Sequence, residues 1–182
     1  MATTEDREGR NQAVVVPEMP APSPWARGKG QVARCRAALY SFLAQALVPP
    51  GEELHLGLKE GLVRLGMAEA LRGMTPLHRR HLEPLVERVP MGEEAPSWDA
   101  LRTEYTRLFA TDLLCPHYEA DYVIPDPFRV VHVIAELVSF YNTFGLQLAQ
   151  GTRERPDYIA IELDFMNFLA TKEALAASRA EA

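Results

Sequence analysis

The side chains best suited to chemistry gather in two short stretches of the 182-residue chain. The first is the loop sequence CPHYEADY, in which four metal-ligating types alternate: Cys115, His117, Glu119 and Asp121. Transition metals take such thiolate, imidazole and carboxylate ligands. All four come from one short run, however, and a closed zinc site normally needs a second pair of ligands. A small metal-dependent hydrolytic enzyme that uses this loop therefore stays open as an alternative.

The second stretch, RERPDYIAIELDFMNFLA at 153–170, carries three carboxylates. We expect a helix from Pro156, because the missing N–H of proline costs nothing in a first turn. Asp157 would then cap the first turn, where free backbone amides and the helix dipole favour a carboxylate. At about 100° per residue, the solvent-facing polar arc would contain Asp164, Asn167 and Thr171. The carboxylates do not converge on one reacting atom, so paired acid/base catalysis is not predicted.

Glu162 falls inside the apolar arc of the same predicted helix. A buried carboxylate needs hydrogen-bond partners or must hold a proton, since an unpaired charge there costs several kcal/mol. We expect Glu162 to accept from an arginine, a tyrosine hydroxyl or loop amides near Tyr118, and so to support a site built by the loop and the helix start.

The elements that must position these residues are helices. Apolar residues recur at helical spacing, and prolines or polar turns separate the segments expected to be helical: 31–48, 52–72, 76–89, 98–110, 128–148 and from 156 onward. Ser97 is a good N-cap, because its hydroxyl can accept from the amide of Ala100. Strand-like alternation is missing, so the sequence predicts an all-α, single-domain bundle of about six helices.

The ends and the cysteines bound the setting. Residues 1–29 are Pro-rich and polar, which predicts a disordered tail before an all-helical domain over 30–182. The sequence contains neither a signal-like start nor an apolar run long enough to span a bilayer. Cys35 and Cys115 have no paired spacing, which suits a reducing compartment. We therefore expect a cytoplasmic protein with no stable membrane insertion.

The charge is concentrated in one segment. The whole chain has a net charge of −6, and residues 99–164 hold eleven acids against five arginines, which also gives −6. This balance argues against nucleic acid as a partner, because phosphate binding needs a basic face. The segment would favour a basic ligand or peptide, although a merely solvated acidic face would give the same count.

Four segments together are similar to a known family. EYTRLF (104–109), CPHYEADY (115–122), ERPDYIAIELDFM (154–166) and RAALYSFLAQAL (36–47) resemble the TorD/DmsD/NarJ type of redox-enzyme maturation chaperone. The resemblance implies a non-catalytic, cofactor-free helical chaperone that binds the twin-arginine leader, or an equivalent N-terminal segment, of a molybdopterin-containing oxidoreductase catalytic subunit. It would hold the apoenzyme for cofactor insertion before export or assembly, as a monomer or homodimer. It also implies one or two further helices after Ala182.

The resemblance also implies site residues. Peptide-binding positions fall on Tyr105, Leu108, Phe109, Pro116, Tyr118, Glu119, Pro156, Asp157 and Tyr158, with Glu162 and Phe165 in support. Tyr158 stands where the family usually has histidine, which puts any role for a charged imidazole there in doubt. We expect the aromatic residues and Leu108 to line an apolar groove, while Asp157 and Glu119 meet arginines through charge-assisted bonds. A purely structural helical adaptor is the remaining alternative.

Overall fold

The computed structural model describes residues 28–111, 115–122 and 127–180. The predicted tail, residues 1–29, lies outside this part except for its last two residues, and Lys29 already begins the first helix. The described residues form seven α-helices and no β-strand, so the all-α prediction is confirmed. The helices are α1 (Lys29–Leu47), α2 (Glu52–Lys59), α3 (Leu62–Arg72), α4 (Pro76–Val86), α5 (Trp98–Thr106), α6 (Pro127–Thr143) and α7 (Ile159–Ala180).

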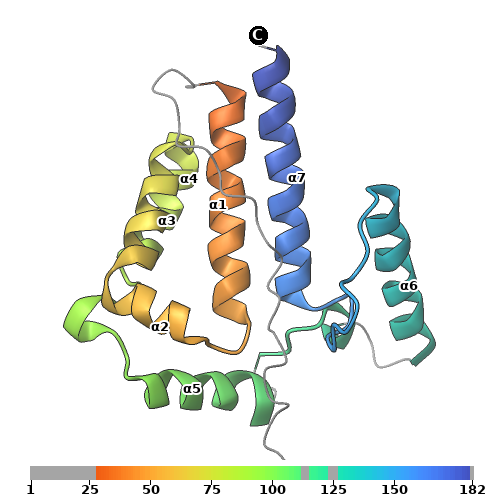
Figure 1. Cartoon of the computed structure of the whole chain (residues 1–182), viewed down its shortest axis with the longest axis horizontal. Coiled ribbons are helices and arrows are strands. Elements are labelled where there is room, and N and C mark those ends of the chain that lie inside the picture. The colour runs from red at the N-terminus through yellow and green to blue at the C-terminus, as the bar shows by residue number, and fades with distance from the viewer. Residues whose placement is uncertain (1–27, 112–114, 123–126, 181–182) are drawn as a thin grey trace, which may run out of the picture.

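The bundle is built around the antiparallel pair α1 and α7, which lie side by side (Figure 1). Helices α2, α3 and α4 cover the outer side of α1, and α6 stands beyond α7 on the opposite side. Helix α5 crosses the base, near the end of α1 and the start of α7. Residues from α1, α5 and the entry to α7 are therefore brought to one end of the molecule.

Small side chains allow α1 and α7 to approach closely. A Cβ added to Gly30 of α1 would lie 3.3 Å from the Cβ of Ala177 on α7, which leaves no room for a larger residue. Buried alanines continue this spacing along both helices: Ala33, Ala37 and Ala44 on α1, and Ala170 and Ala174 on α7. The close contact holds the entry to α7 in a fixed place relative to the end of α1.

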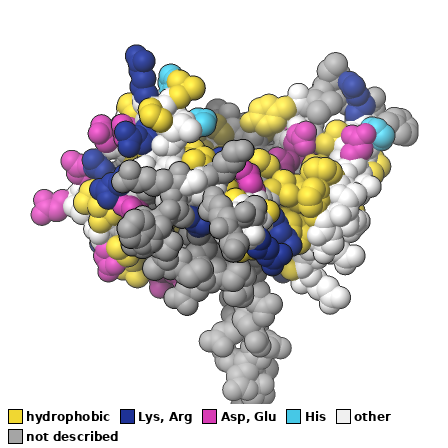
Figure 2. Space-filling view, turned by 90° about the horizontal axis from the view of Figure 1, so that it is seen from above, with side chains coloured by type: hydrophobic (Ala, Val, Ile, Leu, Met, Phe, Trp, Pro, Cys, Tyr) yellow, Lys and Arg dark blue, Asp and Glu magenta, His cyan; other side chains and the backbone are white. Residues whose placement is uncertain are grey.

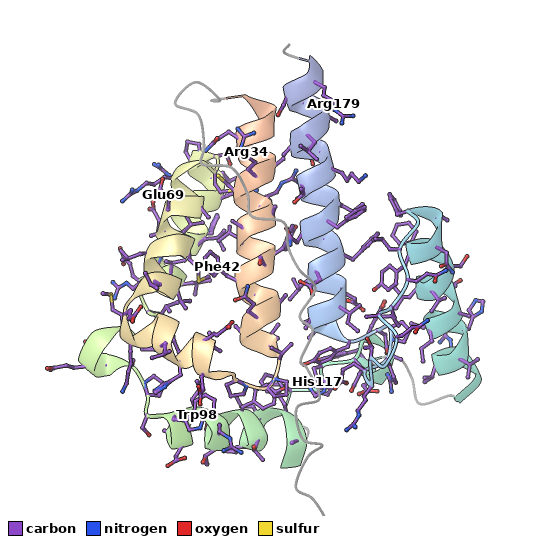
Figure 3. All side chains as sticks on the ribbon, in the orientation of Figure 1. Arg34, Phe42, Glu69, Trp98, His117 and Arg179 are labelled. Carbon is purple, nitrogen blue, oxygen red and sulfur yellow. The ribbon has the colours of Figure 1, made fainter. Side chains whose placement is uncertain are left out.

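A second apolar contact joins α1 to α3 and α4. Cys35, Leu71, Met74 and Val86 are buried together, and Phe42 points from α1 toward α3 (Figure 3). Glycine is needed at position 73, because a Cβ there would lie 2.2 Å from the Cys35 sulfur. The helical hairpins on this side thus support α1 from behind.

Several predicted boundaries are corrected. The single helix expected over 52–72 is two helices, because Gly61 adopts a left-handed conformation with φ 75° between them. Helix α6 ends at Thr143 rather than 148, and Gly145, with φ 72°, lies in the turn that follows. The last helix begins at Ile159 rather than Pro156. The predicted N-cap is confirmed: the amide of Ala100 donates to the Ser97 hydroxyl over 3.2 Å.

The polar arc predicted for α7 does not face solvent. Asn167 is only 8% exposed, and its side-chain oxygen accepts from the Thr171 hydroxyl. Asp164 is half-buried, and burial raises the pKa of its carboxyl group. The prediction failed because α7 lies between α1 and α6, so a helix with one polar arc is covered on more than one side.

Large hydrophobic side chains remain exposed on two parts of the surface. One set belongs to α6, where Phe140 is 50% and Phe144 is 43% exposed, and Figure 2 shows hydrophobic side chains toward this side of the molecule. The other set, which we call the leucine face, belongs to α2, α3 and α4: Leu56, Leu62, Leu65, Leu77 and Leu85. Among the described residues, no helix combines the length and apolar character needed to cross a membrane.

Candidate functional site

The two chemically rich stretches of the sequence meet at the entry to α7. The amide of Glu119 donates to the Asp157 carbonyl over 3.0 Å, and the amide of Ile159 donates to the His117 carbonyl over 2.8 Å. Tyr118 and Tyr158 face each other as an isolated antiparallel bridge. The chain is therefore extended through Tyr158, because its backbone pairs with the loop, and this pairing explains why α7 starts three residues later than predicted.

Asp157 ties the loop to the helix entry with its side chain. The carboxylate is 0% exposed and accepts from the amide of Ala120 over 3.1 Å. Arg155 donates to it twice, from Nε to Oδ1 at 2.9 Å and from Nη2 to Oδ2 at 2.5 Å. Burial alone would raise the pKa of Asp157, but the Arg155 guanidinium and the Ala120 amide outweigh it and lower that pKa. The predicted cap of α7 is instead a cross-link between two segments.

Five rings form what we call the aromatic cluster: Tyr105, Phe109, His117, Tyr118 and Tyr158. Ring centroids lie 4.9 Å apart for Tyr105 and Phe109, and 5.7 Å apart for Phe109 and His117. His117 also contacts Tyr158 at 5.1 Å, and Tyr158 contacts Tyr118 at 5.6 Å. Figure 3 shows His117 at the base of the bundle, close to the start of α7. Residues separated by 53 positions thus form one continuous aromatic surface.

Tyr158 fastens this cluster to α1. Its hydroxyl donates to the Leu47 carbonyl over 2.7 Å, and the Tyr105 hydroxyl lies 3.4 Å from the same oxygen. Carbonyls in the last turn of a helix have no partner within the helix, so this oxygen is free to accept. Tyr158 is 3% exposed, and burial raises the pKa of its hydroxyl well above the ordinary value. At this position the tyrosine acts as a neutral hydrogen-bond donor.

Acidic groups surround the cluster on its solvent side. The Tyr118 hydroxyl donates to Glu154 over 2.5 Å, and burial together with that carboxylate raises the pKa of Tyr118 to about 12. The side chains of Glu119 and Asp121 are exposed on the loop. We call Glu119, Asp121 and Glu154 the acidic rim; it leaves negative charge beside an aromatic surface.

Glu162 lies in the first turn of α7, and its environment only partly matches the prediction. Its Oε1 is shielded from solvent and has no hydrogen-bond partner among the described residues, so the expected arginine, tyrosine or amide donor to this atom is missing. Burial, followed by the charges of Glu119 and Asp157, raises the pKa of Glu162 to about 7. Glu162 therefore takes up a proton near neutral pH instead of forming a permanent ion pair.

The remaining predicted residues divide between this site and a second cluster. Leu108 lies in a π-helical turn, Arg107–Thr111, and its carbonyl accepts from the amide of Cys115. The carbonyls of Pro116 and Pro156 accept from the hydroxyls of Tyr122 and Tyr141, respectively. Phe165 is not part of the site surface: it packs 4.9 to 5.4 Å from three rings of α6, those of Phe140, Tyr141 and Phe144. It fastens α6 to α7.

The comparisons with known proteins agree with this arrangement. The family model described as nitrate reductase delta subunit matches residues 66–182, which include the whole site. The chain belongs to this family. The resemblance to redox-enzyme maturation chaperones, predicted from the four motifs, is thereby confirmed.

A curated relative gives a second comparison. The chain is 31% identical, over 145 residues, to the perchlorate reductase assembly chaperone protein of Dechloromonas aromatica (strain RCB). The aligned region covers 78% of this chain and 62% of that protein, so the chain spans less than two thirds of the length of its relative. No solved structure matches the chain.

Three contributors to this delta-subunit site were not predicted. Arg155 was read only as part of a charge count, although i and i+2 residues of an extended segment point to the same side, and Arg155 and Asp157 have that spacing. His117 was considered only as a metal ligand. The Leu47 carbonyl has no sequence signal, because any residue at the end of α1 would supply it.

The metal-dependent alternative needs ligands that converge. Within residues 28–111, 115–122 and 127–180, no three His, Cys, Asp or Glu side chains are placed to hold one metal ion. The His117 ring lies between aromatic rings. The described loop therefore presents an aromatic surface with an acidic rim.

Proposed function

We propose that this chain is an assembly chaperone for a molybdopterin-containing oxidoreductase, and that it binds the twin-arginine leader, or an equivalent N-terminal segment, of the catalytic subunit. It would hold the apoenzyme in the cytoplasm for cofactor insertion before export or assembly. The observation that carries the proposal is the convergence of three distant motifs on one surface, in a chain of the nitrate reductase delta subunit family. The name of the perchlorate reductase relative supports the assembly role.

The chemistry of the surface suits such a leader. Aromatic side chains with partly exposed faces, such as those of Tyr105, Phe109 and Tyr118, bury apolar residues of an extended peptide at little cost in conformational entropy. The acidic rim supplies the charge that arginines require. We propose that Leu108, Pro116 and Pro156 border the apolar part of this surface.

Asp157 would contribute differently from the other acids. Its carboxylate is closed to solvent and already engaged by Arg155 and Ala120. We propose that the exposed rim attracts the leader, while Asp157 and the buried Tyr158 keep the loop in its binding position. Glu162 would support the entry to α7, and Phe165 would hold α6 in place. None of these roles is catalytic.

Calorimetric titration with two synthetic leader peptides tests the proposal. One peptide carries an Arg pair followed by an apolar stretch, and the other has the Arg pair replaced by Lys. We expect tighter binding of the Arg peptide, with an affinity that falls as salt is added. Glu119→Gln should weaken binding, whereas Glu93→Gln, which removes an exposed carboxylate in the turn between α4 and α5, should not.

The same titration separates the alternatives. Equal binding of the Arg and Lys peptides would favour a helical adaptor without leader specificity. No binding of either peptide, by a protein that is folded, would contradict the proposed function.

A further inference from the structure

Arg155 occupies a site built like the arginine-binding sites of protein interfaces. Its guanidinium makes a two-bonded fork with the Asp157 carboxylate, and its Cζ lies 4.2 Å from the centroid of the Tyr118 ring. A second carboxylate, that of Asp121, lies 3.4 Å from Nη2. A fork, an aromatic face and a second negative charge are the contacts that distinguish a guanidinium from an ammonium group.

The pocket itself is built from outside Arg155. Asp157 is held in place by the Ala120 amide, and Tyr118 by the backbone bridge and by Glu154. The Arg155 side chain closes it from the solvent side: 37% of that side chain is exposed, whereas the Asp157 side chain is 0% exposed. A ligand can therefore reach the carboxylate only by taking the place of the Arg155 guanidinium.

We propose that Tyr118, Asp121 and Asp157 form a guanidinium-binding pocket that takes an arginine of a partner segment in exchange for Arg155. The identity of the partner, an Arg-containing leader, rests on the proposed function. The exchange replaces one guanidinium by another, so its own free energy is close to balanced. Net affinity then comes from contacts that flank the arginine, such as those with the aromatic cluster.

The internal arginine would set the specificity of the site. Because it is tethered two residues from Asp157, it competes at an effective concentration of the order of millimolar or higher. Free arginine or an isolated basic residue does not outcompete it. A lysine cannot form the fork or stack on Tyr118, so a Lys-rich segment leaves the pocket closed.

The pocket is tested first without any leader. In Arg155→Ala, methylguanidinium should raise the melting temperature in a saturable way, while methylammonium at the same concentration should not. Neither the wild-type chain nor Arg155→Ala/Asp157→Asn should show the rise. If Arg155→Ala does not fold, Arg155→Gln, which keeps most of the side-chain length, replaces it. Equal effects of methylguanidinium and methylammonium would overturn the inference.

Peptide binding tests the exchange. We expect Arg155→Ala to bind the Arg-pair peptide about tenfold more tightly than the wild-type chain, which corresponds to a pocket open about one tenth of the time. Binding of the Lys peptide should stay unchanged. Unchanged or weaker binding of the Arg peptide by the folded variant would show that Arg155 is only a structural link, and would contradict the exchange.

The two proposals fail in different ways. If neither peptide binds but methylguanidinium still stabilises Arg155→Ala, the leader function is wrong and the pocket stands. If the Arg peptide binds both proteins equally and methylguanidinium has no effect, the pocket is wrong and the leader function stands.

Discussion

Glu162 gives the chain a dependence of stability on pH that one substitution should remove. In the folded protein its carboxyl group ionises near pH 7, because it is half-buried and close to Glu119 and Asp157. In the unfolded chain the ordinary pKa is 4.5. The folded state therefore binds a proton more tightly, and its contribution to stability is complete below pH 4.5 and is lost as the pH rises through about 7.

The size of the effect follows from these values. The change from 4.5 to about 7 corresponds to about 3 kcal/mol at about 1.4 kcal/mol for each pH unit, which solvent screening of a half-buried group reduces to about 2 kcal/mol. Glu162→Gln is neutral at every pH and close in shape to the protonated acid. It should match the wild type near pH 4.5 and be more stable by about 2 kcal/mol at pH 8.

Urea denaturation of both proteins at a series of pH values measures this difference. Glu93→Gln, which changes an exposed carboxylate remote from the site, is the matched control and should follow the wild type throughout. A constant offset between Glu162→Gln and the wild type from pH 4.5 to pH 8, or a variant that is less stable at pH 8, would refute the reasoning.

Three further substitutions test how the site and its supports are held. Tyr158→Phe removes the donor to the last carbonyl of α1 and should cost about 1–2 kcal/mol in urea denaturation, whereas Tyr122→Phe, whose hydroxyl is exposed, should cost less; equal losses would contradict the buried bond. Gly73→Ala places a methyl group 2.2 Å from the buried cysteine sulfur of α1 and should cost about 1–3 kcal/mol, while Gly51→Ala, whose methyl group meets nothing within 4 Å, should cost less; a neutral Gly73→Ala would show that α1 and α3 separate easily. Ser97→Ala should cost about 1 kcal/mol through loss of the α5 cap, and an unchanged melting temperature would argue against that cap.

Features set by neighbouring residues were readable from the sequence. The Ser97 cap was predicted correctly because a cap depends on only a few consecutive residues. The split at Gly61 was missed, although a glycine inside a long apolar pattern is a signal for a break. Helix content and the family motifs were likewise local, and both predictions hold.

Features set by distant residues were not readable. The start of α7 at Ile159 depends on a hydrogen bond to His117, 42 positions earlier, and no local pattern records it. Asp157 satisfies the rules for a helix cap equally well, so local reasoning could not show that Ala120 and Arg155 engage it instead. The exposure of α7 was misjudged for the same reason, since helices from both sides cover its polar arc.

Hydrogen–deuterium exchange of the chain with the Arg-pair peptide tests the central claim most directly, because it locates the bound peptide without any substitution. The account predicts slower amide exchange in segments 105–109, 115–122 and 154–159, and no change on the leucine face of α2, α3 and α4. Protection confined to the leucine face, with unchanged exchange at the aromatic cluster, would contradict the account.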